Sequence, residues 1–208
     1  MLTVGLDGAV VEDALCSGGI SCPLTGCGQV LRPWGWARDR SVRGAARLRP
    51  RRGRCRGCRG TQVLLPASVL LRRGDPVAVI GLALLAKAGG AGHRRIAEQL
   101  GLPASTVRGW LRRIAAVADR VLAVLAAVAA ELGAEFMPPA PTAEPAAAVV
   151  ELLGALSRAM TLRLGGSYSP WRLAAVVSGG RLLSPGGPEP VSGWALGRNT
   201  NSLWAAGP

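Results

Sequence analysis

Apolar residues recur at helical spacing on both sides of Gly101, with polar residues between them. The inward positions of the two predicted helices are Ile96, Ala97, Leu100, Leu102, Val107, Trp110 and Leu111. Gly101 lies where the chain must turn sharply, because a residue without a Cβ tolerates the left-handed conformation. Pro103 suits the opening of the second helix, and Ser105 or Thr106 offers a hydroxyl near its start. The pattern predicts a helix-turn-helix over residues 92–114.

The outward positions of this motif are polar or basic. They are Ser105, Thr106, Arg108, Gly109, Arg112 and Arg113 on the second helix, with His93, Arg94 and Arg95 at the start of the first. A recognition helix presents such side chains to base edges and phosphates in the major groove. The competing interpretation is an ordinary helical hairpin with Val107 and Trp110 in its core. The sequence favours binding to double-stranded DNA because the small residue, the glycine and the apolar positions fall in register.

The second helix of the motif is predicted to continue to about Glu135. Leu111, Ala118, Leu125 and Leu132 repeat every seven residues, and Ile114, Val121 and Val128 fall at the alternate heptad position. One interpretation is a homodimer seam through the helix 111–132. The other is a long helix that packs against the core of its own domain or against the C-terminal segment.

Strands and further helices are predicted on either side. Thr61–Leu65 resembles a short strand that ends at Pro66, and the apolar stretch Pro76–Lys87 is expected to form the first helix of a three-helix domain. A helical pattern returns over residues 146–164, and Ser169–Trp171 opens another helix. We expect a mainly α fold with a small N-terminal β zinc-ribbon-like module. The expected segments are a basic module (1–66), the helix-turn-helix domain with its extended helix (67–136), a Pro-rich linker (137–147), a helical segment (148–183) and a flexible tail (184–208).

The apolar runs Val77–Ala86 and Val121–Ala130 are shorter than the roughly 20 residues that a membrane helix needs. The first residues carry acids where a signal peptide would be basic. We therefore expect no membrane segment and a cytoplasmic, nucleoid-associated protein.

The chain is strongly basic, with 25 Lys+Arg against 12 Asp+Glu, a formal charge of +13 and a pI near 11.4. Such a balance favours an anionic partner such as nucleic acid. Lys87 is the only lysine. Arginine suits bidentate contacts to phosphate and guanine, although a GC-rich genome would produce the same preference.

Four of the five cysteines form two close pairs, Cys22 with Cys27 and Cys55 with Cys58. Two such pairs separated by a hairpin-length stretch suit tetrahedral zinc. The first pair has a longer gap than usual, which leaves open a degenerate site without metal. Cys16 lies in a predicted amphipathic helix and is interpreted as a small buried residue. Four sulfur ligands would leave no open position, so the role of the zinc would be structural.

The densest charge lies between and just after the cysteine pairs. Eleven arginines fall between Arg32 and Arg59, including Arg51 and Arg52, against the single acid Asp39. One interpretation is a hairpin that follows a phosphate backbone, with Trp34 and Trp36 available for stacking. The alternative is that both tryptophans cover the ribbon core and the arginines are solvated.

Several segments together resemble a family of actinobacterial proteins of unknown function with a zinc-ribbon-like start and a helix-turn-helix. They are CPxxxCG (22–28), LRPWGWARDRSVRG (31–44), RCRGCRGTQVLLP (54–66), GAGHRRIAEQLGLPASTVRGWLRR (90–113) and WRLAAVVSGGRLL (171–183). Members of the family are often described as transposase-related. The resemblance covers residues 20–135 well and implies DNA binding linked to mobile elements. The first cysteine pair departs from the family pattern by its length.

No catalytic constellation is evident, and we expect neither an enzyme nor a small-molecule substrate. The acids after the helix-turn-helix have no predicted βαβ unit to hold them for two-metal chemistry. Tyr168 as a recombinase nucleophile would need clustered Arg and His residues, and His93, the sole histidine, is interpreted as a helix-end residue or phosphate contact. The leading hypothesis is sequence-specific binding of double-stranded DNA through the helix-turn-helix, assisted by the Arg-rich zinc ribbon. The alternatives are a non-catalytic transposase-derived or accessory protein, and a zinc-ribbon adaptor for protein or RNA.

Overall fold

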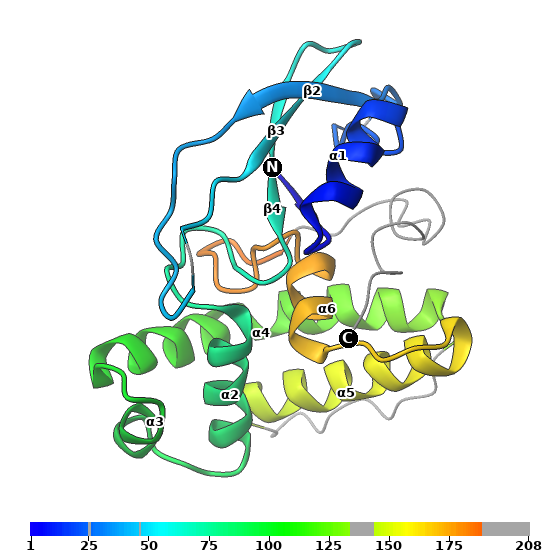
Figure 1. The fold of residues 1–208 in the computed structure, drawn as a ribbon. Coiled ribbons are helices and arrows are strands. Elements are labelled where there is room, and N and C mark those ends of the chain that lie inside the picture. Colours follow the sequence, from blue (N-terminus) through cyan, green and yellow to red (C-terminus); the bar gives the residue numbers. More distant parts are fainter. Residues whose placement is uncertain (25, 46, 134–143, 189–208) are drawn as a thin grey trace.

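A small sheet with one helix stands on a layer of helices (Figure 1). The computed structural model describes residues 1–24, 26–45, 47–133 and 144–188. In chain order its elements are β1 (Leu2–Val4), α1 (Gly8–Ser17), β2 (Leu31–Trp36), β3 (Arg51–Cys55), β4 (Thr61–Pro66), α2 (Val77–Ala88), α3 (His93–Leu100), α4 (Ala104–Glu131), α5 (Pro145–Leu164) and α6 (Pro170–Val177). The expectation of a mainly helical chain with a small N-terminal β module is confirmed at this level.

The four strands lie in the order β1-β4-β3-β2, so β2 is an edge strand. β2, β3 and β4 are antiparallel, whereas β1 adds to β4 in parallel, with Leu2 opposite Leu64. The sequence did not predict β1, which has only three residues. The N-terminal ammonium donates a hydrogen bond to the side chain of Gln62 and so fixes the start of this strand.

Helix α1 covers the sheet with Val11, Ala14 and Leu15. Asp7 caps its start, because its carboxylate accepts a 2.8 Å hydrogen bond from the Ala9 N–H. Cys16 lies in this helix as predicted, but it is exposed, so the prediction that it is buried was wrong. It directly follows the buried Leu15, about 100° further round the helix, and its thiol lies on the exposed side next to the Glu12 carboxylate.

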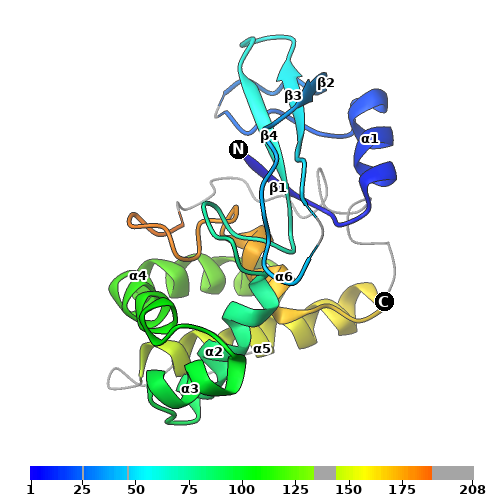
Figure 2. The same cartoon turned by 60° about the vertical axis from the view of Figure 1, so that its left-hand side comes forward.

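Helices α2, α3 and α4 contact one another (Figure 2). Gly101 links α3 to α4 in the left-handed conformation at φ 63°, and the Leu102 N–H donates to the Ala97 carbonyl at 2.9 Å. Helix α4 begins at Ala104, after Pro103, and no side chain caps it. Pro103 therefore precedes the helix rather than opening it, and the hydroxyls of Ser105 and Thr106 do not act as caps.

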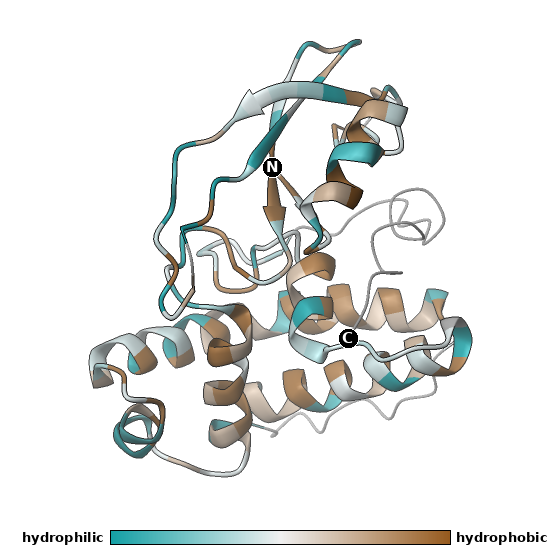
Figure 3. Ribbon diagram, viewed as in Figure 1, coloured by the Kyte–Doolittle hydropathy of each residue, from teal (hydrophilic) through white to brown (hydrophobic). Residues whose placement is uncertain are grey.

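The heptad positions of α4 are used within the chain. Ile114, Val121, Leu125, Val128 and Leu132 are buried in the helical core, which α5 shares. Ala118 is also buried, and Leu111 is half-buried against this core. Of the two interpretations of the heptad, intrachain packing is the one that the structure shows (Figure 3). A dimer seam through these residues would require α5 to leave, and homodimerisation itself stays a prediction.

The sheet and the helical layer have separate cores but are joined at several points. The Leu71 N–H donates to the Gly180 carbonyl at 2.8 Å, and α6 contacts β1. The long β2–β3 loop descends towards α2 (Figure 1), where Arg43 Nε donates to the buried Asp75 carboxylate at 2.7 Å. The predicted modules 1–66 and 67–136 are therefore in contact through the β2–β3 loop and the segment just before α2.

The predicted linker and tail fall largely outside the described residues. The structure describes 144–147 of the linker, where Glu144 caps α5 through the Ala147 N–H. It also describes 184–188 of the tail, of which Gly187 and Pro188 are buried. Arg120 of α4 donates a hydrogen bond to the Gly186 carbonyl, so this stretch follows α4.

One described helix is long and apolar enough to cross a membrane by length and composition. The window is Pro145–Arg163, outside the two apolar runs considered from the sequence, and 44% of it is buried inside the fold. A core helix of a soluble protein passes the same test, so this finding is weak evidence for a membrane.

A close approach between α2 and α6 gives a stability test. A Cβ added at Gly81 would lie 2.1 Å from Cδ2 of Trp171, so the indole would have to move. We expect Gly81→Ala to lower the free energy of unfolding by about 1–3 kcal/mol, despite the better helix propensity of alanine. Urea denaturation measures this change.

Gly154→Ala in α5 is the matched control. Its added Cβ would meet only the end of the flexible Arg158 side chain, at 3.4 Å. This variant should be neutral or stabilised by up to about 1 kcal/mol. Equal stabilisation of both variants would contradict tight packing at Gly81.

Candidate functional site

The four paired cysteines converge on one point. The sulfur atoms of Cys22, Cys27, Cys55 and Cys58 all lie within 4.8 Å of one another, and none forms a disulfide. The Cys22 and Cys58 sulfurs are 3.7 Å apart, and those of Cys27 and Cys55 are 3.4 Å apart. Tetrahedral thiolates at about 2.3 Å from a metal would be about 3.8 Å apart. The donor set and its spacing fit a four-coordinate metal ion.

Backbone hydrogen bonds hold the two cysteine-bearing turns in place. In the first turn, the Cys22 N–H donates to the Gln29 carbonyl at 2.7 Å, and the Cys27 N–H donates to the Leu24 carbonyl at 3.1 Å. In the second, Cys55 ends β3 and its N–H donates to the Gly60 carbonyl at 2.9 Å. Because Leu31 pairs with Cys55 across β2 and β3, both turns lie at the same end of the hairpin.

The thiols differ in their readiness to lose a proton. The backbone N–H of Gln29, followed by the Cys55 thiol, lowers the pKa of Cys27 to about 7. Burial raises the pKa of Cys22 to about 12. A metal must therefore displace a tightly held proton from Cys22, whereas Cys27 supplies a thiolate near neutral pH.

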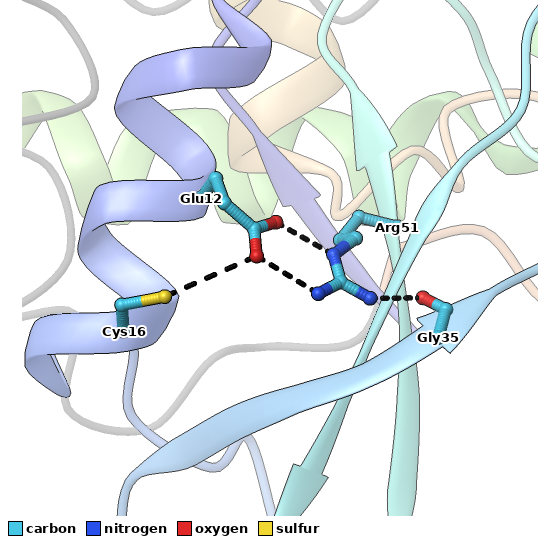
Figure 4. A network of polar contacts seen from close by, with 4 residues as sticks. All are labelled: Glu12, Cys16, Gly35 and Arg51. Atoms are coloured by element: carbon cyan, nitrogen blue, oxygen red, sulfur yellow. Dashed lines mark hydrogen bonds and ion pairs between the residues drawn. The ribbon is translucent and has the colours of Figure 1, made fainter.

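The guanidinium of Arg51, a predicted phosphate contact, is hydrogen-bonded to Glu12 and Gly35 in the N-terminal part of the chain (Figure 4). Its Nε and Nη2 donate to the two carboxylate oxygens of Glu12 at 2.6 and 2.8 Å, and its Nη1 donates to the Gly35 carbonyl at 2.6 Å. The hydrogen bond with Arg51 lowers the pKa of Glu12, and the same contact raises the pKa of Arg51. These three hydrogen bonds leave the Arg51 guanidinium less available to a phosphate, and its role as a DNA contact stays a prediction.

The other arginine predicted from the hairpin, Arg52, is half-buried on β3. Its Nε is buried and has no hydrogen-bond partner among the described residues. It stays a candidate, and its position on the strand distinguishes it from Arg51, whose side chain joins α1 to the hairpin.

Both tryptophans of the hairpin are exposed. Trp34 is 52% and Trp36 53% exposed, and neither belongs to the core between the sheet and α1. The guanidinium carbon of Arg54 lies 4.3 Å from the ring centroid of Trp34, and that of Arg51 lies 4.9 Å from the ring centroid of Trp36. The alternative that these indoles cover the ribbon core is therefore not what the structure shows.

The predicted outer face of α4 is exposed. Ser105, Arg108 and Arg112 are spaced three and four residues apart, so they share one side of the helix, and all three are exposed. Thr106 and His93 are half-buried, whereas Arg94, Arg95 and Arg113 are exposed. Within the described part of the chain, none of the five arginines in this set forms an ion pair.

Sequence reasoning missed a half-buried arginine beside α4. Arg73 donates through Nη2 to the Leu183 carbonyl at 2.9 Å, and its buried Nε has no hydrogen-bond partner among the described residues. Burial, and then the charge of Arg113, lowers the pKa of Arg73. Arg73 lies in the segment between β4 and α2, which carries no motif, so no local signal in the sequence identifies it.

No protein-family model, curated protein or solved structure gave a significant match to this chain. The resemblance to the actinobacterial family therefore stays a prediction from the motifs.

The four-cysteine cluster predicts selective loss of metal. We expect Cys55→Ser, at a buried position, to lower bound metal from about one ion per chain to a small fraction. The variant lacks one of the four ligands, and the folding that is coupled to metal binding is weakened with it. Elemental analysis of the purified protein measures the ratio.

Cys16→Ser is the matched control, because Cys16 is exposed and lies outside the cluster. It should keep the full metal content. Equal metal content in the Cys55→Ser variant and the unchanged protein would show that the cluster does not hold the ion.

Proposed function

We propose that the chain binds double-stranded DNA by placing the N-terminal half of α4 in the major groove. The observation that carries this proposal is the division of α4 into two sides. Val107, Trp110 and Ile114 are buried, whereas Ser105, Arg108 and Arg112 are exposed and free of acidic partners among the described residues. Unpaired arginines on one side of a helix suit base edges and phosphates.

The start of α4 supports the same orientation. No side chain caps this helix, so its first-turn N–H groups have no side-chain acceptor. Such groups, together with the helix dipole, favour a phosphate at this end. In a helix-turn-helix, the first helix crosses the DNA backbone while the second lies in the major groove. α3 is a short helix that precedes α4 and would take the place of the first.

We further propose that the metal is zinc and that its role is structural. Four thiolates form a closed tetrahedral set for this ion, with no position left for substrate. The cluster fixes one end of the β2–β3 hairpin, whose loop extends to the start of α2 through Arg43 and Asp75. Zinc would thereby hold the basic hairpin in a defined position beside the helical layer.

Arg73 and Arg113 are proposed to hold a backbone phosphate beside α4. The Nη1 atom of Arg113 lies 3.0 Å from the Cβ position of Gly109, so its side chain lies back along the helix. The two cations repel each other, and within the described residues neither has a carboxylate partner. A phosphate between them would relieve this repulsion.

The direct test is selection from a pool of random duplexes with the metal-loaded protein at two salt concentrations. An enriched motif would establish sequence-specific recognition, and a two-fold symmetric motif would indicate a dimer. Salt-sensitive retention without a motif would show phosphate binding alone. Absence of retention at both salt concentrations would reject duplex binding.

Arg112 provides a residue-level prediction. Arg112→Ala should weaken binding to the selected duplex by about 1–3 kcal/mol if the side chain reads a base, or lower the salt slope by about 1 if it contacts phosphate. Fluorescence anisotropy titrations over a range of salt concentrations separate these outcomes. Arg158→Ala removes the same charge from an exposed position on α5 and should change neither quantity by as much.

The phosphate contact at Arg73 and Arg113 makes a different prediction. Arg113→Gln should lower the salt slope by about 0.9 and weaken selected and unrelated duplexes to the same degree, because a phosphate carries no base identity. Arg73→Lys keeps the charge but loses the planar fork, so it should weaken binding with little change in slope. If both variants bind like the unchanged protein, this phosphate contact does not exist.

A further inference from the structure

Trp34 and Arg54 form a pair on the exposed surface of the hairpin that the duplex-binding proposal does not use. The indole is 52% exposed, and the guanidinium carbon of Arg54 lies 4.3 Å from its ring centroid. One face of the ring is thus covered by a cation while about half of the side chain stays open to solvent. A large aromatic side chain that is not needed in a core, and is held in this way, is suited to contact a ligand.

The charge of Arg54 is not neutralised by the protein. Its Nε donates to the Arg59 carbonyl at 3.3 Å, and among the described residues it has no ion pair with an acid. Among the described residues, no hydrogen bond or ion pair occupies its Nη groups, which can therefore take an anion as their partner. The pair combines a flat apolar surface with an adjacent cation, which is the chemistry that recognises a nucleobase together with its phosphate.

Trp36 differs from Trp34 in this respect, although the two have nearly the same exposure. The guanidinium carbon of Arg51, the nearer of its two arginines, is 4.9 Å from the ring centroid, and Arg51 forms an ion pair with Glu12. The strand also has a register shift between Pro33 and Gly35, with Gly35 at φ 114°, so regular alternation is broken between the two tryptophans. Trp34 therefore has a free cation next to it, whereas the nearest cation at Trp36 is part of the fold.

The form of nucleic acid follows from the geometry of stacking. Bases in a duplex already stack on both faces, and reaching one of these faces would require unstacking a base step at a cost of a few kcal/mol. An unpaired base offers its face without that cost, and stacking on an aromatic residue tolerates any base. β2 is an edge strand, so Trp34 lies at a margin of the sheet that a flexible nucleic-acid strand can approach, with Arg54 beside it on β3.

We propose that Trp34 and Arg54 form a binding site for unpaired nucleotides, with a base stacked on the indole and a phosphate on the guanidinium. The ligand class is single-stranded nucleic acid, either DNA or RNA. The site is separate from the α4 face and does not depend on duplex binding.

The test uses the full-length, metal-loaded protein and fluorescence anisotropy with three labelled oligomers of equal length: oligo-dT, oligo-rU and an abasic DNA strand. The abasic strand keeps the phosphates and lacks the bases. We expect oligo-dT or oligo-rU to bind more tightly than the abasic strand, and the preferred one identifies the natural source. Equal affinity for all three would overturn the proposal, because phosphates alone would then account for binding.

Trp34→Ala should weaken the preferred oligomer by about 5- to 100-fold and leave duplex affinity unchanged. Trp34→Leu, which keeps an apolar side chain, should show a similar loss and guards against a folding defect. Arg54→Gln should lower the salt slope for the oligomer by about 0.7. Trp36→Ala is the matched control from the same strand and should show a smaller loss than Trp34→Ala.

Unchanged oligomer binding in both Trp34 variants would overturn the proposal even if duplex binding stands. Conversely, loss of oligomer binding in those variants would support it even if the α4 variants show no duplex recognition. The two proposals therefore succeed or fail on different measurements.

Discussion

The N-terminal part of this chain depends on the convergence of four sulfur atoms. Two of the cysteines, Cys22 and Cys55, are also members of the small core between the sheet and α1. A core of this size stabilises little by itself, and small domains commonly need a metal or disulfides in addition. Binding of an ion at the cluster would therefore act on the same residues that pack α1 on the sheet, so metal binding and folding would be linked.

The arginines fall into two groups that the sequence does not separate. One group is used by the fold: Arg51 joins Glu12 to Gly35, and Arg43 joins the hairpin loop to Asp75. The other group is exposed or lacks an acidic partner among the described residues, as at Arg54, Arg108 and Arg112. The first group adds cohesion within the chain, and the second is the group that the proposed binding to an anionic partner would use. Only the second group is informative about function.

Much of the helical part could be predicted because its signals are local. The periodicity around Gly101, the apolar stretch before Lys87 and the proline at position 170 each identify a helix from neighbouring residues, and α3, α2 and α6 lie where expected. The cysteine spacing likewise predicted a cluster that the structure forms. These features depend on capping, periodicity and ligand spacing, which act over a few residues or through known geometry.

The remainder depended on contacts between residues far apart in sequence. The pairing of Glu12 with Arg51 spans 39 positions, and that of Arg73 with Leu183 spans 110. The heptad of α4 is compatible with either a second copy or α5, and only the fold decides between them. The exposure of Trp34 is of the same kind, because an indole beside arginines has the same sequence pattern whether it is buried or open.

The contact between Arg43 and Asp75 constrains the shape of a nucleic acid that binds both parts of the chain. It ties the hairpin loop to the first turn before α2, while the Leu71 to Gly180 hydrogen bond ties the adjoining segment to the turn after α6. These two contacts therefore restrain the position of the hairpin relative to α3 and α4. If the exposed side of α4 and the Trp34–Arg54 pair both bind nucleic acid, the protein selects for the distance between two sites. A paired stretch and an unpaired stretch would have to lie a fixed number of nucleotides apart to be bound together. Length, in addition to sequence, would then decide which sites on a chromosome this chain occupies.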